Sequence, residues 1–598
     1  MNIIQRAETS GVEREETMNA PTTAIGYDRV NMDCGGKRSA TPLWISTTRA
    51  DVAAKAPSPL RSAGALPMAL LLIALFVSPG LSATAAEPKP VLAKGRTLVF
   101  VDDHDILYRS GTRRVLRPPT KHPQNPLITE DKPWEMTIGW TSMHRDAKTG
   151  KYQLWYQAYA GKRAQLKTHE CTVAYAESED GLTFTKPNLG LHDFNGDTNN
   201  NIVLLGSGVY GDRYCNSVIV DPAEPDPKRR YKMAFSDWSV DDQGEYWVGM
   251  HVAFSPNGIR WTKHPGPPLH RSFYGAKQIQ PPLLGEHPYG ETRLPDGRVR
   301  RRALLPLTHS DAADVIYDPK RKAFVIYGKM WIDGPDGGMG WKHGMGRSES
   351  KDFLHWSKPQ LVCAPDDPDG ALEFHSSPVF IHRERYFSLN QILNRAGGGV
   401  MDIELMVSRD GLAWERPFRA PWFIPRSPGE AFDSGTIVTT SSFITNGNEM
   451  RFYYGAYSSG AIGGGTNITG DQQKSGVGLA TLPLDRFAGI RSEPQPPTAK
   501  TKSPPNIGQI TLKPFDLRNT KAITINADAS VGAVRAELLT ADGYRVPGFT
   551  KADSAVLRGD NLRHSVKWKR GNLAKLPRAN YLLRLHLENA EVFAVTFE

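Results

Sequence analysis

The sequence is poor in cysteine, and none of its cysteines has the spacing of a metal motif. Its 598 residues include four cysteines, and no two of them form a Cys-x-x-Cys pair, which argues against a zinc site. Three of them, Cys171, Cys215 and Cys363, lie beyond residue 86. That part of the chain can therefore hold at most one disulfide. No spacing of candidate ligands requires a metal, so we predict no cofactor. A structural Ca²⁺ ion is the one alternative left open.

Long apolar runs with a helical period are also absent between about residues 95 and 490, which argues against alternating strands and helices. The 45 prolines and 55 glycines indicate many turns and favour a β-rich fold. The net charge is +10, but the basic residues are scattered. They form either a solvated surface or a site for an acidic ligand such as a uronate or a sulfated glycan. Nothing resembles a nucleic-acid-binding module, so we predict no nucleic-acid partner.

The amino-terminal part differs from the rest of the chain. Residues 1–60 have no clear apolar periodicity and indicate a disordered segment or an over-extended gene start. Residues 61–86 combine Arg61, an apolar run over 65–77 and an Ala-x-Ala site at 83–85. This pattern is typical of a secretory signal, and the alternative is an uncleaved membrane anchor. We therefore expect export to the periplasm or the extracellular space, with no other membrane association.

One short pattern, Ser-x-Asp/Asn-Gly-x-x-Phe/Trp, organises the chain. Asp-Gly and Asn-Gly favour the positive φ angles of a two-residue hairpin turn, and the aromatic residue packs where the return strand begins. In the third copy, Phe353 takes the place of the glycine. The four copies span residues 178–184, 255–261, 350–356 and 408–414.

Each copy ends a longer unit that comprises an apolar strand, a charged turn and an aromatic-rich strand. A fifth unit, with a decayed hairpin, fits residues 436–480. Five up-and-down meanders predict an all-β fold, a five-bladed β-propeller over residues 96–491. A proline-rich linker, 492–506, precedes alternating strands over 507–598. We interpret those strands as a small antiparallel β-sandwich that either binds sugar or only packs against the propeller.

This architecture resembles that of glycoside hydrolase family 32, and the propeller alone is also similar to families 43 and 68. The segments Val101-Asp-Asp103, Lys132-Pro-Trp-Glu135 and 175–181 resemble a secreted bacterial subgroup related to family 32. The resemblance implies hydrolysis of glycosidic bonds by two carboxyl groups. The chain has no Asn-Asp-Pro-Asn motif, and Arg145-Asp-Ala147 and Glu373-Phe374 only partly match two other family motifs.

Glycoside hydrolysis needs one protonated and one ionised carboxyl group. In a propeller, ligands bind where the first strands of the blades open, and each unit has an acid near that position. We predict Glu373 as general acid, Asp433 or Glu135 as nucleophile or general base, and Asp314 as a residue that orients substrate or stabilises the oxocarbenium-like state. The predicted substrate-binding residues are Asp212, Arg213, Trp134, Trp140, His375 and Glu430.

The sequence thus predicts an exported glycoside hydrolase that acts on an oligo- or polysaccharide and is a monomer. Two alternatives remain. A non-catalytic carbohydrate-binding propeller would expose tryptophans and amides without an acid pair, and an interaction scaffold would have a funnel closed by apolar side chains. For each predicted acid, a solvated carboxylate or a structural hydrogen bond is the competing interpretation.

Overall fold

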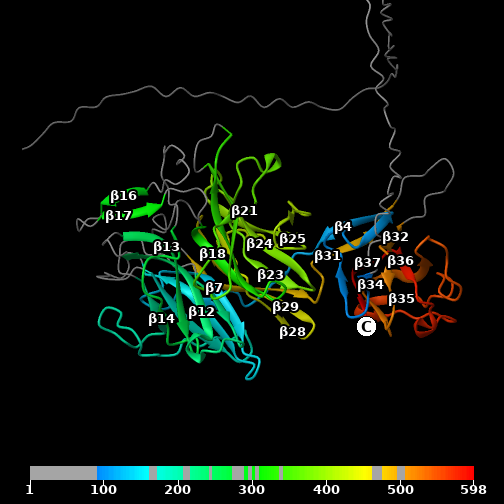
Figure 1. Ribbon diagram of the computed structural model, residues 1–598, viewed down its shortest axis with the longest axis horizontal. Coiled ribbons are helices and arrows are strands. Elements are labelled where there is room, and N and C mark those ends of the chain that lie inside the picture. The colour runs from blue at the N-terminus through cyan, green and yellow to red at the C-terminus, as the bar shows by residue number, and fades with distance from the viewer. Residues whose placement is uncertain are drawn as a thin grey trace, which may run out of the picture. The chain divides into compact units, whose positions relative to one another are not determined.

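The computed structural model describes residues 91–160, 171–206, 216–240, 246–271, 289–293, 299–303, 309–335, 341–460, 474–494 and 506–598. The chain divides into the units Met1–Ala85 and Ala86–Glu598, and only the second contains described residues. The predictions for residues 1–60 and 61–86, and for most of the linker, fall outside them. The described part is almost entirely β, which confirms the predicted fold class (Figure 1). It contains no α-helix and three short 3₁₀ segments, η2 (Pro227–Arg229), η3 (Asp367–Asp369) and η4 (Leu573–Lys575).

The described strands between residues 120 and 483 form five successive antiparallel meanders, here numbered in chain order. Meanders 4 and 5 belong to one sheet because a single parallel bridge joins Met401 to Thr436. Meander 1 comprises β7 (Thr137–Arg145), β8 (Tyr152–Tyr159), β9 (Cys171–Ser178) and β10 (Ile202–Leu205). Meander 2 comprises β11 (Ser217–Val220), β12 (Tyr231–Val240), β13 (Tyr246–Ser255), β14 (Thr262–Lys263), β15 (His270–Arg271), β16 (Tyr289–Arg293) and β17 (Val299–Ala303). Meander 3 comprises β18 (His309–Asp318), β19 (Ala323–Ile332), β20 (Lys342–Ser350) and β21 (Gln360–Cys363).

Meander 4 comprises β22 (Glu373–Ser376), β23 (Val379–His382), β24 (Arg385–Asn394), β25 (Val400–Ser408) and β26 (Trp414–Glu415). Meander 5 comprises β27 (Thr436–Val438), β28 (Phe443–Asn446), β29 (Glu449–Tyr457) and β30 (Ser475–Pro483). Two strands from much earlier in the chain, β5 (Thr120–Lys121) and β6 (Ile128–Thr129), complete meander 5 by pairing with β30. Residues just before meander 1 therefore tie it to the last meander.

The repeated pattern forms a capped turn in every copy. In the first, the Ser178 hydroxyl accepts a hydrogen bond from Gly181 N, and the Asp180 carboxylate accepts two more, from Leu182 N and Thr183 N. Only the glycine has a positive φ, 74°, so the prediction of a two-residue turn with two positive φ angles was wrong. The aspartate side chain satisfies the backbone donors itself, which keeps its own φ negative.

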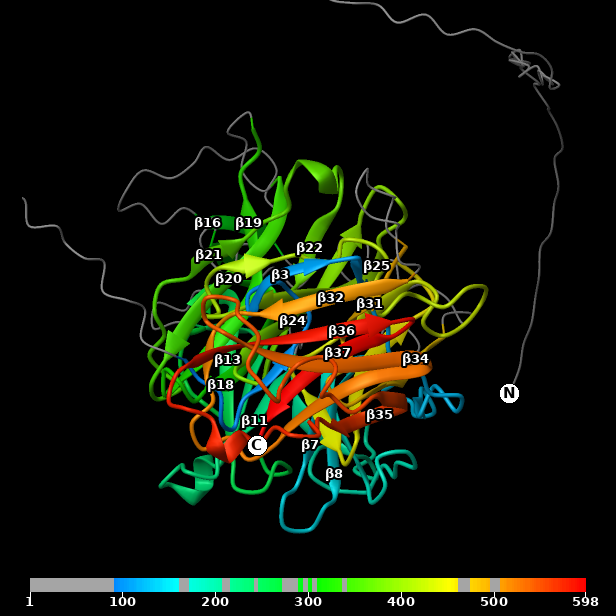
Figure 2. The same cartoon turned by 90° about the vertical axis from the view of Figure 1, so that its right-hand side faces the viewer.

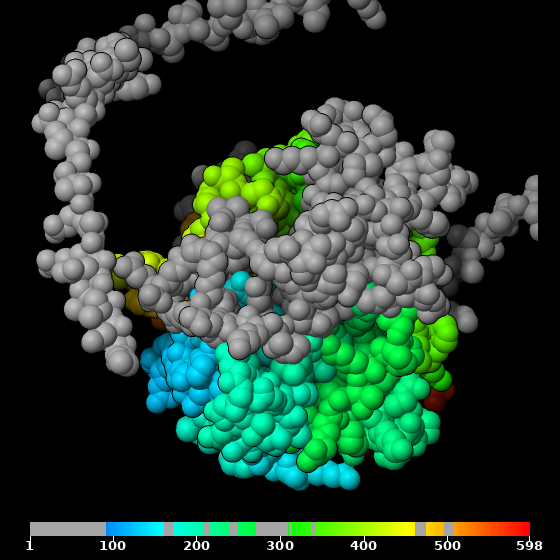
Figure 3. All heavy atoms as spheres, turned by 90° about the vertical axis from the view of Figure 1, so that its left-hand side faces the viewer, coloured from blue at the N-terminus to red at the C-terminus, as the bar shows by residue number. Residues whose placement is uncertain are grey.

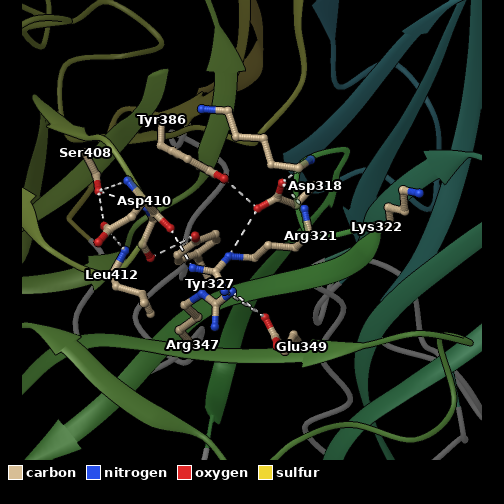
Figure 4. Close-up of polar contacts among 12 residues, drawn as sticks. Asp318, Arg321, Lys322, Tyr327, Arg347, Glu349, Tyr386, Ser408, Asp410 and Leu412 are labelled. Carbon is tan, nitrogen blue, oxygen red and sulfur yellow. Dashed lines mark hydrogen bonds and ion pairs between the residues drawn. The ribbon is translucent and has the colours of Figure 1, made fainter. Parts of the chain in front are cut away.

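Each capped turn also binds the neighbouring meander. Tyr327 of meander 3 donates to Gly411 O of meander 4 at 3.0 Å, and Arg321 donates to Asp410 O at 3.1 Å (Figure 4). Trp155 of meander 1 donates to Gly258 O of meander 2, and Figure 3 shows those cyan and green meanders side by side.

The same contact joins the last meander to the first. Tyr453 of meander 5 donates to Gly181 O of meander 1 at 2.8 Å, and Arg451 donates to Asp180 O at 2.8 Å. The meanders therefore follow one another in a closed order, as radial repetition requires. The exact number of blades remains a prediction.

The third copy departs from this scheme at two positions that compensate each other. Phe353 occupies the glycine position with a φ of 68° and is fully buried. At the three glycine copies, a Cβ atom would lie 2.5 Å or less from Tyr453, Trp155 or Tyr327. The corresponding position of meander 2 is Ala234, which belongs to the same apolar cluster as Phe353. The small alanine leaves the space that the phenylalanine ring fills.

The carboxyl-terminal strands form an 11-stranded sheet that also contains the first four strands of the described chain (Figure 2). β2 pairs with β37, β3 with β32, and β4 with β31. Residues 96–116, which the sequence analysis assigned to the propeller, thus belong to this sheet. Its strands are β1 (Val91–Leu92), β2 (Thr97–Val99), β3 (Ile106–Ser110), β4 (Thr112–Leu116), β31 (Ala488–Ser492), β32 (Ile507–Leu512), β33 (Phe515–Asp516), β34 (Ile523–Thr540), β35 (Leu557–Ser565), β36 (Asn580–Glu588) and β37 (Glu591–Phe597).

Candidate active site

The first strands of meanders 1 and 4 each contain a β-bulge near their amino-terminal end. In β7 the register shifts between Gly139 and Thr141, and in β22 it shifts between Phe374 and Ser376. A bulge leaves one residue out of the ladder and redirects its side chain, and bulges are common next to active sites. The residues concerned are Trp140 and His375.

The two bulged residues meet. The rings of Trp140 and His375 lie 5.7 Å apart with an interplanar angle of 31°. Both are half-buried, and His375 Nδ1 lies 3.2 Å from the Gln391 side-chain oxygen. Trp140 has a φ of 43°, which is rare for a bulky residue and marks local strain of the kind found at functional sites. The structure therefore brings together two of the predicted substrate-binding residues.

Glu373 lies two residues before His375 and is buried. Its Oε2 lies 2.6 Å from His343 Nδ1, and its Oε1 accepts a hydrogen bond from Arg395 Nε at 2.7 Å. Burial alone would raise the pKa of Glu373, but the hydrogen bonds from His343 and Arg395 outweigh it and lower the pKa to about 2. This environment favours an ionised carboxylate, whereas the predicted general-acid role needs a protonated one.

Glu135 lies just before β7 in the opposite electrostatic situation. Its side chain is fully buried. Tyr156 donates to Oε1 at 2.6 Å, and Lys186 donates to Oε2 at 2.6 Å. Desolvation is the largest influence and raises the pKa of Glu135 despite the opposing effect of Lys186. Of the two predicted catalytic glutamates, this is the one whose pKa is raised.

Asp433 precedes β27 and is buried against the early strand β5. Lys121 Nζ donates to its Oδ2 at 2.6 Å, and the Tyr454 hydroxyl donates to the same oxygen at 2.9 Å. Glu430, three residues earlier, is exposed, and its main-chain oxygen accepts a hydrogen bond from Lys474. Asp433 is thus held in place, whereas the Glu430 side chain faces solvent.

Asp314 lies at the junction of three meanders. Its carboxylate contacts Ser217 of meander 2 and accepts hydrogen bonds from the Ser441 amide and hydroxyl of meander 5 at 2.6 and 2.8 Å. Burial raises the pKa of Asp314 to about 6, although these hydrogen bonds act against the rise. Its contacts are those of a residue that joins meanders.

The remaining predicted substrate-binding residues are Trp134, Asp212 and Arg213. Trp134 is buried, and its indole N–H donates to Asn201 at 3.0 Å, so it offers no open face for a sugar ring. Asp212 and Arg213 lie outside the described residues. Within the part of the chain that the structure describes, no hydrogen bond or ion pair joins Glu135, Glu373 and Asp433 to one another; each is bound to a basic side chain of its own.

Sequence reasoning missed those partners, which are the cations Lys186, Lys121 and Arg395 and the imidazole of His343. They come from strands or loops far from the acids they bind, by 51 positions for Lys186 and 312 for Lys121. No local motif signals such a pair, and the available signal was only the occurrence of basic residues in the same or a neighbouring meander.

Within the described ranges, no group of three or more His, Cys, Asp and Glu residues could hold a metal ion. Cys363 is a free thiol, the Gln157 side-chain amide donates to the Cys171 sulfur at 3.3 Å, and Cys215 lies outside those ranges. The described residues include no helix long and apolar enough to span a bilayer.

No family model matches the chain, and no curated protein matches it. Solved structures do. One titled as a glycoside hydrolase is 14% identical, with a TM-score of 0.38, over 67% of this chain and 96% of its own. A glycosyl hydrolase from Bacteroides ovatus is 16% identical, with a TM-score of 0.37, over 61% and 94%.

A third structure is an N-acetylgalactosamine deacetylase from F. plautii in complex with blood group B trisaccharide. It is 15% identical, with a TM-score of 0.37, over 63% of this chain and 97% of its own. Values this low do not assign the chain to a family, so its function has to be argued from the chain's own residues.

Proposed function

We propose that the protein is an exported glycoside hydrolase whose active site lies at the amino-terminal ends of the first strands of its meanders. The observation that carries the proposal is the meeting of Trp140 and His375, which two separate bulges redirect toward each other. An indole face suits the apolar face of a sugar ring, and an imidazole suits its hydroxyl groups.

Two carboxyl groups with opposed environments lie on the same chain segments as this pair, Glu135 five residues before Trp140 and Glu373 two residues before His375. The pKa of Glu373 is about 2, whereas burial raises that of Glu135. Glycoside hydrolysis uses one ionised and one protonated carboxyl group, and environments that separate two pKa values indicate which is which. We assign Glu373 the ionised role and Glu135 the proton-donor role, the reverse of the assignment that the sequence suggested for Glu373.

In the proposed reaction, the Glu135 proton passes to the leaving glycosidic oxygen as the bond to the anomeric carbon breaks. Glu373 either takes a proton from the water that attacks the anomeric carbon, or attacks that carbon itself to form a glycosyl ester, which water then hydrolyses while giving its proton to Glu135. Arg395 and His343 keep Glu373 ionised, and Trp140 and His375 hold the sugar. Export rests on the signal-like segment at residues 61–86.

The test is a turnover screen of the exported chain on plant, algal and fructan oligosaccharides, followed by Glu373→Gln on whichever substrate is cleaved. We expect kcat/KM to fall by at least about 100-fold, because the amide cannot act as a base or nucleophile. Glu415→Gln is the matched control, since Glu415 is an exposed residue of the same meander. Unchanged turnover in Glu373→Gln would remove Glu373 from the mechanism.

One observation favours a non-catalytic carbohydrate-binding protein instead. The side chains of Glu135, Glu373 and Asp433 are each no more than 5% exposed, and each is paired with a cation. Buried ion pairs of this kind can serve structure alone. Sugar binding that Trp140→Ala abolishes, without turnover of any tested glycan, would support this second function.

A further inference from the structure

A cavity of about 480 Å³ lies on a different part of the chain from the candidate active site. It lies between the segment that leads into β2 and the hairpin that joins β23 to β24 of meander 4. The capped turn of meander 4 contributes Arg409 to it, and the turn between β18 and β19 contributes Lys320. Its basic lining residues are Arg96, Lys320, Arg383, Arg385 and Arg409, and two histidines, His104 and His382, lie beside them.

The lining has a single acidic side chain among the described residues, Glu384. The carboxylates that accompany the arginines lie outside the lining. Asp102 accepts hydrogen bonds from Arg409, and Asp485 accepts two from Arg383 at 3.0 and 2.9 Å. These acids hold the guanidinium groups in place without occupying the cavity.

The arginine and lysine side chains that line the cavity also have N–H donors that these carboxylates do not use. A guanidinium group has five N–H donors, and Arg383 uses Nε and one terminal nitrogen for Asp485. Lys320, which is exposed, has three and donates one to the main-chain oxygen of Glu384 at 2.7 Å. Planar guanidinium groups and ammonium groups are the usual partners of carboxylate and sulfate oxygens.

The hairpin that lines the cavity is strained. Arg383 and Glu384 form its two-residue turn with φ values of 49° and 62°. Such turns normally use Asn-Gly, because larger side chains disfavour the left-handed region. Backbone strain of this kind persists at ligand clamps, where it holds a side chain in a required position. Here it places Arg383 in the cavity lining.

We propose that this cavity binds a sugar that carries a carboxylate or sulfate group. The volume lies in the range of small-molecule sites and is far larger than a free tetrahedral oxyanion needs. Arg383, Arg409 and Lys320 would bind the acidic group, and the Thr97 hydroxyl and His104 would bind sugar hydroxyls; His382 Nε2 is already paired with Asp485 at 2.6 Å. Burial and the Arg409 charge lower the pKa of His104, which suits a neutral imidazole in that role.

This proposal is independent of glycoside hydrolysis, because it concerns a different cavity and needs no turnover. The experiment is calorimetric titration of the full chain at constant ionic strength. The four probes are D-galacturonate, galactose 6-sulfate, neutral D-galactose and inorganic sulfate. We expect at least one acidic sugar to bind and to bind at least tenfold more tightly than galactose or inorganic sulfate.

Lys320→Glu should weaken that binding at least tenfold, since it places a carboxylate beside the ligand's own. Lys148→Glu is a matched control. Lys148 and Lys320 each follow an aspartate by two residues in equivalent turns, and each main-chain N–H donates to that aspartate at 2.9 Å. Lys148 is exposed and does not line the cavity.

Three results would overturn the proposal: equal affinity for galactose and both acidic sugars, including no binding at all; equal weakening by the two lysine variants; or binding of inorganic sulfate without either acidic sugar. The last result would mark a site for a free oxyanion.

Discussion

Asp314 is a buried residue whose raised pKa should make the stability of the protein depend on pH. Its pKa is about 6 in the folded protein, against an ordinary value of 3.8. The folded state therefore holds the proton more tightly than the unfolded state, so this contribution is complete below pH 4 and is lost as the pH rises through 6. Relative to Asp314→Asn, the wild type should lose about 2 kcal/mol of unfolding free energy between pH 4 and pH 7.5.

Urea unfolding of both proteins, followed by tryptophan fluorescence at several pH values, measures this difference. The asparagine can still accept from Ser441 and donate to a serine hydroxyl, but it does not titrate in this range. Asp542→Asn, at an exposed turn, should leave the pH dependence as it is. A constant difference between the wild type and Asp314→Asn would show that Asp314 keeps an ordinary pKa.

Glu373 gives a second pH prediction, which rests on the proposed function. Arg395 and His343 lower the pKa of this buried carboxyl to about 2. Removing the charge in Arg395→Ala should raise the pKa and move the acid limb of the kcat/KM profile upward by about one pH unit or more. Arg578→Ala, at an exposed position, is the control. An unmoved acid limb would mean that another group sets it.

At this scale the sequence identified which residues are unusual but not what they do. Glu135 and Glu373 were chosen because they precede aromatic strands, and both prove to be buried beside the first strands. Their pKa directions depend on Lys186 and Arg395, whose proximity only the tertiary fold creates. The strain at Trp140 was equally hidden, because a bulge depends on how two strands pair and not on local composition.

The capped turn is the element that repeats, and its third copy tests how the meanders fit together. Phe353 fills the space that Ala234 leaves, whereas the other copies pair a glycine with a tyrosine or tryptophan. Phe353→Gly alone should destabilise the protein by about 2–4 kcal/mol, since the lost ring outweighs the relief of the left-handed strain. Ala234→Tyr alone should cost about 1–3 kcal/mol through overpacking.

The double variant should recover much of both losses, because tyrosine and glycine recreate the Tyr327–Gly411 arrangement of the next pair of meanders. A double-mutant cycle from urea unfolding measures the coupling, which we expect to exceed about 1 kcal/mol. Strictly additive effects would show that the two positions do not share one space.

Strand periodicity predicted most elements correctly in type but not always in extent. The aromatic strands over 152–156 and 324–327 are confirmed inside β8 and β19, which continue further. The two strands expected at 523–527 and 533–538 are one, β34. β34 continues through residues 528–532, with register shifts in its pairing to β35.

For the whole molecule, local patterns could not show which sheet a strand joins. The strands over 96–116 were assigned to the propeller because they lead into it along the chain. They pair instead with strands more than 370 residues later, and Leu98, Phe100 and Ile106 belong to the core of the carboxyl-terminal sheet. Such pairing depends on hydrogen-bond partners and shared burial, neither of which leaves a periodic signal in one segment.

This pairing predicts that the carboxyl-terminal sheet cannot fold without its amino-terminal strands. A fragment of residues 484–598 would expose the edges of β37, β32 and β31 that β2, β3 and β4 cover, together with the apolar surface beneath Leu98 and Phe100. It should therefore lack a cooperative thermal transition, as expected when a small domain loses part of its core.

Adding residues 91–117 to this fragment, joined by a flexible linker, should restore that transition and the fluorescence of buried Trp568. The same addition with Leu98→Asp and Phe100→Asp should fail, because it supplies the strands without their apolar side chains. Cooperative folding of the fragment alone would show instead that the early strands only cover a sheet that is already complete.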